Sequence, residues 1–189
     1  MSRKAQRMSS AKKFISETRA LDMLEQVRDE FRAKIGSYEA RAESCSTCDT
    51  RGACCLDAHF VNVRISRLEA VATNQAIAEI GEPLRSEIYQ RIDEAIDRFG
   101  LHESNPEKTY ACPLFDRETG CVVHATAKPL PCINHACYER REDLPPDELL
   151  DAAELEIDRL NRKVYGRSLP VMSLPIAIKR EKLTTDSHR

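Results

Sequence analysis

The sequence CSTCDTRGACC, residues 45–55, places four cysteines in one short stretch that contains no large apolar side chain. The Cys45-x2-Cys48 spacing lets two thiolates of one tight turn reach the same metal ion. Cys54 and Cys55 are adjacent, and neighbouring side chains of an extended chain point to opposite sides. The two thiols of this pair could therefore bind two different metal ions, or a metal ion and a cluster, or one could bind a metal while the other packs in the protein.

The other four cysteines lie in a second irregular segment, residues 101–138. Like residues 40–58, this segment shows no helical period of apolar residues. Because the thiols gather where the periodicity vanishes, we expect them to be metal ligands rather than scattered core residues. The predicted metal ligands are Cys45, Cys48, Cys54, Cys55, Cys112, Cys121, Cys132 and Cys137.

Ligands that are mostly thiolates select zinc, an iron–sulfur cluster or Cu(I), and disfavour magnesium and calcium. Two closed sites of four thiolates would use all the cysteines, and one [4Fe–4S] cluster with additional structural thiols also fits. His59, His124 and His135 lie near cysteines and could replace a thiolate, although a surface or hydrogen-bonded imidazole is the simpler interpretation of each. The sequence predicts Zn2+ or an iron–sulfur cluster as cofactor, [4Fe–4S] if the metal is iron.

Disulfides are the alternative use of these cysteines, and they belong to oxidising compartments. Residues 1–19 contain six basic residues, one acidic residue and no apolar run typical of a secretory signal. Nowhere do about 18 apolar residues follow one another, so we expect no membrane partner. These features predict a cytoplasmic protein with reduced thiols. The basic stretch has Phe14 as its one aromatic residue, which disfavours nucleic acid as a partner.

Apolar residues at three- and four-residue steps predict helices outside the cysteine segments. Ser66 and Glu69 have the spacing of a capping box, and Ser9-Ser10 offers a cap for the first helix. The helices are expected at residues 9–38, 66–80, 83–100 and 147–165.

Three further segments have other signals. Residues 59–65 alternate as a short strand, and Cys112–Phe115 and Cys121–His124 flank a Gly-containing loop as a β-hairpin does. Residues 167–189 contain two prolines, which favours an extended strap.

The composition bounds the size of the core. The chain has 189 residues, and 41% of them are hydrophobic, which suffices for one modest core. It contains no Trp, and its net charge is −2. We therefore predict a mainly α fold, with two Cys-rich irregular segments and a short β-hairpin around a metal centre. Its parts would be an N-terminal amphipathic helix with a basic start (1–39), a cysteine-cluster metal-binding domain including the C-terminal helix (40–166) and an extended tail (167–189).

The chain resembles the YkgJ-type cysteine-cluster family over residues 45–137, in Cys45-x2-Cys48-x5-Cys54-Cys55, Cys112-Pro113-Leu114-Phe115, Gly120-Cys121-Val122-Val123-His124 and Pro129-x2-Cys132. Members of that family are described as zinc- or iron-chelating bacterial proteins. The resemblance implies metal binding in a bacterial cytoplasm, and it supplies no known reaction. His124 stands where the family usually has Tyr, and Lys128 and Ile133 stand where it usually has Arg, so the thiols are kept while any role of those arginines is lost.

Three functions remain open at this stage. The first is a metal-binding protein in which the thiolates organise the fold. The second is an iron–sulfur redox or methyl-transfer enzyme, or an accessory protein to one, because a similar cysteine cluster occurs in the flagellin lysine methylase family. The third is a metal-stapled module that presents its helices to a protein or a nucleic acid. The chain has no dinucleotide-binding loop, Walker motif, nucleophile elbow or His-Glu-x-x-His helix, so no catalytic residue is predicted.

Overall fold

The computed structural model describes residues 14–43, 47–59, 61–102 and 105–186. The prediction of a mainly α fold is confirmed, with small two-stranded antiparallel sheets between the helices. The helices are α1 (Glu17–Glu39), α2 (Ala53–Leu56), α3 (Arg67–Ala78), α4 (Leu84–Arg98), α5 (Leu130–Asn134), α6 (Asp147–Tyr165) and α7 (Leu174–Asp186). The strands are β1 (Arg64–Ile65), β2 (Phe115–Asp116), β3 (Gly120–Cys121) and β4 (Met172–Ser173).

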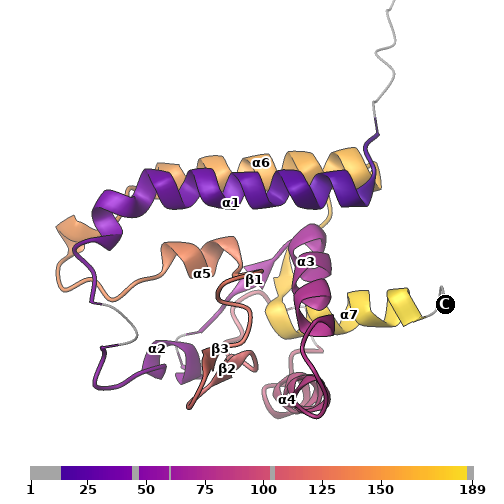
Figure 1. Ribbon diagram of the computed structural model, residues 1–189, viewed down its shortest axis with the longest axis horizontal. Coiled ribbons are helices and arrows are strands. Elements are labelled where there is room, and N and C mark those ends of the chain that lie inside the picture. Colours follow the sequence, from indigo (N-terminus) through magenta and orange to yellow (C-terminus); the bar gives the residue numbers. More distant parts are fainter. Residues whose placement is uncertain (1–13, 44–46, 60, 103–104, 187–189) are drawn as a thin grey trace, which may run out of the picture.

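The long helices α1 and α6 form one edge of the molecule (Figure 1). The side chain of Ser16 accepts a hydrogen bond from the backbone N–H of Arg19 (3.2 Å) and so caps α1. The two helices run antiparallel, because the N–H of Ile15 donates to the carbonyl of Lys163 near the end of α6 (3.2 Å). They enclose a first core of Ala20, Leu24, Phe31, Ile35, Leu68, Leu130, Ile133, Ile157 and Leu160. The helix predicted at residues 147–165 is confirmed. The helix predicted at residues 9–38 is α1, but its predicted start and its cap at Ser9-Ser10 are wrong, because α1 begins at Glu17 and Ser16 caps it; Ser9 and Ser10 themselves lie outside the described residues.

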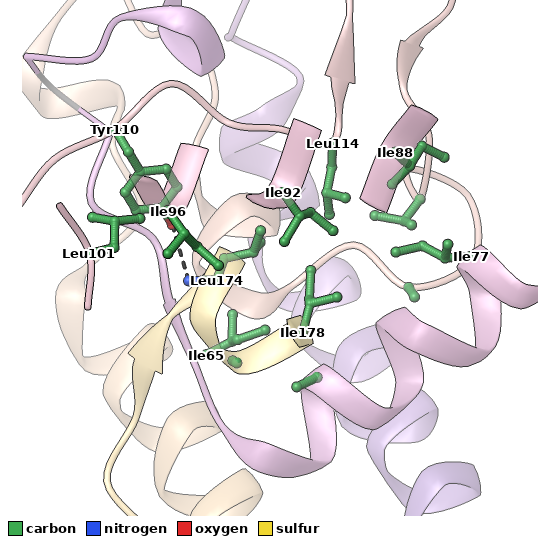
Figure 2. Close-up of a cluster of buried hydrophobic side chains, with 14 of the residues drawn as sticks. Ile65, Ile77, Ile88, Ile92, Ile96, Leu101, Tyr110, Leu114, Leu174 and Ile178 are labelled. Carbon is green, nitrogen blue, oxygen red and sulfur yellow. Dashed lines mark hydrogen bonds between the residues drawn. The ribbon is translucent and has the colours of Figure 1, made fainter. Parts of the chain in front are cut away.

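A second core lies between α3, α4 and α7. The predicted capping box is present at the start of α3, where the Ser66 side chain accepts from the N–H of Glu69 and the Glu69 carboxylate accepts from the N–H of Ser66. Figure 2 shows side chains from all three helices converging, among them Ile77, Ile88, Ile92, Ile96, Leu174 and Ile178. The apolar face predicted for residues 83–100 is therefore the face that packs inward.

The expectation of an extended strap over residues 167–189 is wrong for Leu174–Asp186, which form α7. Leu174, Ala177 and Ile178 recur at helical spacing and are buried against α3 and α4, so packing decides the conformation. Pro175 is compatible with this helix because it lies in the first turn, where a backbone N–H has no intrahelical acceptor. Of the strand predicted at residues 59–65, the described part contains β1, which has two residues because its partner β4 has two residues with which to pair.

Tyr110 joins the second core to the chain that carries the later cysteines. Its ring is fully buried, its hydroxyl donates to the carbonyl of Val63, and the same oxygen accepts from the N–H of Leu174 (3.2 Å). This side chain therefore fixes the segment before Cys112 against β1 and the start of α7.

Candidate metal centre

The irregular segments contain short helices that the sequence did not predict. Cys54 and Cys55 lie in α2, which follows Gly52 in a left-handed conformation (φ 80°). Cys132 lies in α5, whose first residue is buried in the first core and donates its N–H to the Glu69 carboxylate (3.0 Å). Tertiary packing at Leu130 and Ile133 explains why five residues form a helix without a long period of their own.

The predicted hairpin is confirmed, with shorter strands than expected. Phe115 pairs with Cys121 and Asp116 pairs with Gly120. The Asp116 carboxylate accepts hydrogen bonds from the backbone N–H groups of Glu118 and Thr119 (2.9 Å each), which closes the turn. The hairpin brings Cys121 close to Cys112, because the N–H of Val122 donates to the carbonyl of Leu114 (3.0 Å).

Backbone hydrogen bonds connect the two cysteine segments directly. The N–H of Cys112 donates to the carbonyl of Cys55 (2.8 Å), so α2 lies against the segment that leads into the hairpin. The N–H of Glu43 donates to the carbonyl of Cys137 (2.9 Å), and these two residues form an isolated antiparallel bridge. Segments separated by more than fifty residues in the sequence therefore meet at both ends of the first cysteine stretch.

Gly52 allows this approach. A Cβ atom at this position would lie 2.0 Å from the ring of Phe115, and the backbone conformation itself favours glycine. The ring of Phe115 thus occupies the space that a side chain would fill, and α2 packs directly on the hairpin.

Thiols from both segments act on one another's pKa values. Burial raises the pKa of the Cys55 thiol, and the thiols of Cys112, Cys54 and Cys121 raise it further. Burial also raises the pKa of Cys112 to about 12, while the backbone N–H groups of Leu114 and Phe115 act in the opposite direction. Each thiol would therefore be hard to ionise without a cation nearby.

The same holds for Cys132. Burial raises the pKa of its thiol well above the ordinary value, and the thiols of Cys112 and Cys121 add to this effect. We call Cys55, Cys112 and Cys132, whose thiol pKa values are raised, together with Cys54 and Cys121, whose thiols act on them, the thiol cluster.

The remaining predicted ligands are placed differently. Cys45 lies outside the described residues, and the thiol of Cys48 is 3.5 Å from the hydroxyl of Thr50. Within the described ranges, no group of three or more His, Cys, Asp or Glu side chains is arranged to hold a metal ion. The described cysteines, Cys48, Cys54, Cys55, Cys112, Cys121, Cys132 and Cys137, are in no disulfide.

The histidines near the cysteines have other surroundings. His59 is exposed, and its backbone N–H donates to the Asp57 carboxylate (2.9 Å). Burial lowers the pKa of His124, and the charges of Lys128 and Arg32 lower it further. Burial and Lys128 likewise lower the pKa of His135.

A cleft of about 500 Å³ lies beside the thiol cluster and was not predicted from the sequence. It is bordered by Leu56 and Ala111, the chain neighbours of Cys55 and Cys112, and by three arginines, Arg91, Arg98 and Arg117. A sequence signal existed: Arg91 and Arg98 are seven residues apart, two turns along one side of α4. Nothing in the sequence placed Arg117 of the hairpin turn opposite them.

Comparison with protein-family models, with curated proteins and with solved structures finds no match to this chain. None of the described helices has the length and apolar character needed to cross a lipid bilayer.

Proposed function

We propose that this chain is a metal-binding protein, in which cysteine thiolates from residues 45–55 and 112–137 hold zinc or an iron–sulfur cluster in a bacterial cytoplasm. The observation that carries the proposal is the thiol cluster, to which α2, the hairpin and α5 each contribute a half-buried cysteine.

The chemistry of the cluster fits a bound cation. A metal ion or cluster, when bound, supplies positive charge and folding free energy at thiols that burial and mutual repulsion otherwise keep protonated. The cluster supplies Cys54, Cys55, Cys112, Cys121 and Cys132 as the first candidates for ligands. Cys45, Cys48 and Cys137 complete the predicted set of eight.

Backbone groups of the chain would support such a site. The N–H groups of Leu114 and Phe115 act on the Cys112 sulfur in the sense that favours a thiolate. The Glu69 carboxylate holds the first residue of α5, and the Cys112–Cys55 backbone hydrogen bond holds α2. The scaffold therefore fixes the sulfur-bearing segments through contacts that do not involve the thiols.

The test is the metal content of the chain purified without oxygen. We expect about one or two zinc ions per chain, or iron with a broad absorption band near ~400 nm if a cluster is bound. Cys112→Ser and Cys121→Ser should each lower the metal content. His102→Ala is the control, because His102 is exposed and contacts Asp97 (3.0 Å), away from the thiols. Full metal content in both cysteine variants would contradict the proposal.

A further inference from the structure

The cleft beside the thiol cluster is lined by three arginine side chains from two separate elements of the fold. Arg91 and Arg98 come from α4, and Arg117 comes from the turn between β2 and β3. The guanidinium of Arg98 lies over the ring of Phe99 at 5.4 Å. Across the described ranges, no carboxylate forms an ion pair with Arg98 or Arg117.

Arg91 is the innermost of the three. Its Nη1 lies 3.4 Å from the carbonyl oxygen of Phe115 and 3.7 Å from the Asp116 carboxylate, which are long contacts for a guanidinium. Its Nε and Nη2 are buried and have no hydrogen-bond partner. These two nitrogens are enclosed by protein atoms, so the Arg91 guanidinium would attract an oxyanion in the cleft by its positive charge rather than by hydrogen bonds from Nε and Nη2.

The acidic residues of the cleft neutralise these arginines only in part, because Asp116 forms a long ion pair with Arg91 (3.7 Å). Asp116 already accepts hydrogen bonds from two backbone N–H groups and from the hydroxyl of Thr119 (3.2 Å), and these bonds lower the pKa of its carboxyl group. Glu118 is exposed on the turn. Three arginines against these two carboxylates leave the lining with an excess of positive charge.

The rest of the lining is apolar. Leu56, Phe99 and the buried Phe115 border the cleft, and its volume of about 500 Å³ is that of a site for a small organic molecule. An inorganic anion would leave most of this space and these apolar groups without contacts.

We propose that this cleft binds a small organic oxyanion, whose phosphate or carboxylate group pairs with Arg91 and its neighbours and whose apolar, ring-containing body contacts Phe99 and Phe115. The cleft is distinct from the metal ligands, since no cysteine lines it. It borders the thiol cluster through Leu56 and Ala111, so a bound molecule would lie beside the proposed metal centre.

The test is a calorimetric or NMR titration of the full, metal-loaded chain with phenyl phosphate, benzoate, phenol and inorganic phosphate. We expect phenyl phosphate or benzoate to bind at least about tenfold more tightly than phenol and inorganic phosphate, because each of the latter lacks half of the recognised chemistry. The stronger of the two oxyanions identifies the group that the arginines prefer.

Variants locate the site. Arg91→Gln should weaken binding of the preferred oxyanion by about tenfold or more. Arg117→Gln should also weaken it, and because Arg117 lies on an exposed turn, this variant still tests the site if Arg91→Gln fails to fold. Arg85→Gln is the matched control, because Arg85 lies on the same helix and pairs with Glu82 (2.9 Å). The metal content of all three arginine variants, measured in parallel, should stay unchanged. A loss of oxyanion binding without a loss of metal therefore tests this proposal separately from the metal proposal.

Three results would overturn the inference: binding of neither oxyanion, inorganic phosphate binding as tightly as phenyl phosphate and benzoate, or undiminished binding in both Arg91→Gln and Arg117→Gln.

Discussion

Replacement of Glu69 by alanine should destabilise the fold strongly, because one buried carboxylate joins two helices. Glu69 is 4% exposed. One of its oxygens accepts from the N–H of Ser66 (2.9 Å) and the other from the N–H of Leu130 at the start of α5 (3.0 Å). Its charge also favours the charged form of Arg28, a guanidinium whose pKa burial lowers.

The magnitude follows from the groups left behind. Each buried N–H that loses its acceptor costs about 1–3 kcal/mol, so Glu69→Ala should lower the free energy of unfolding by about 2–6 kcal/mol. Glu69→Gln keeps one acceptor oxygen and should lose about half as much. For a domain whose total is about 5–15 kcal/mol, this loss would be a large fraction of the free energy of unfolding.

Urea unfolding followed by circular dichroism measures the free energy of unfolding of both variants. The slope of that free energy against urea concentration should be the same in the variants and the original chain. Glu79→Ala is the control, because Glu79 is an exposed residue at the end of α3 and should change the free energy of unfolding by less than about 0.5 kcal/mol. If Glu69→Ala were as stable as this control, the carboxylate would not hold α5 in place and the account of how Cys132 is positioned would be wrong.

Three other predictions use the same measurement. Gly52→Ala should cost about 2–5 kcal/mol, because its backbone favours glycine and a Cβ atom would collide with Phe115, whereas Gly81→Ala meets nothing within 4 Å and should be tolerated. Tyr110→Phe should cost about 0.5–1.5 kcal/mol, since the hydroxyl bonds to Val63 and Leu174 are lost while the N–H of Leu174 still donates to the carbonyl of Val63 (3.0 Å); an unchanged midpoint would contradict this. A chain ending at residue 169 should lose cooperative unfolding, because α7 fills the second core, and a retained sharp transition would count against that role.

Local signals in the sequence predicted α3, α4 and α6 closely, whereas α1 begins later in the chain than expected. The capping box at Ser66 and Glu69, the Pro146 and Gly166 boundaries of α6 and the turn before Gly120 are formed by residues close together in the chain. Such signals depend on backbone propensity and hydrogen bonding within a few residues, so they survive in the folded protein.

The elements that the sequence missed depend on distant contacts. Pro170 and Pro175 suggested an extended tail, but the groove between α3 and α4 decides that Leu174–Asp186 are helical. The short helix α5 likewise exists because Leu130 and Ile133 fit the core under α1 and α6. Tertiary packing overrides local preference in both segments.

The cysteine positions were informative about proximity but not about geometry. Spacing alone indicated that two segments would share a function, and the backbone contact between Cys55 and Cys112 brings those segments together. Which sulfurs point at one another depends on α2, the hairpin and α5, each set by packing from elsewhere. The arginines of the neighbouring cleft had no motif to reveal them, because their juxtaposition depends on the placement of α4 against the hairpin.

X-ray absorption spectroscopy at the zinc or iron edge of the chain, purified without oxygen, identifies the atoms that bind the metal. We expect a first coordination shell dominated by sulfur, at about 2.3 Å if the metal is zinc. A shell made only of oxygen and nitrogen, or a chain that holds no metal under these conditions, would contradict it.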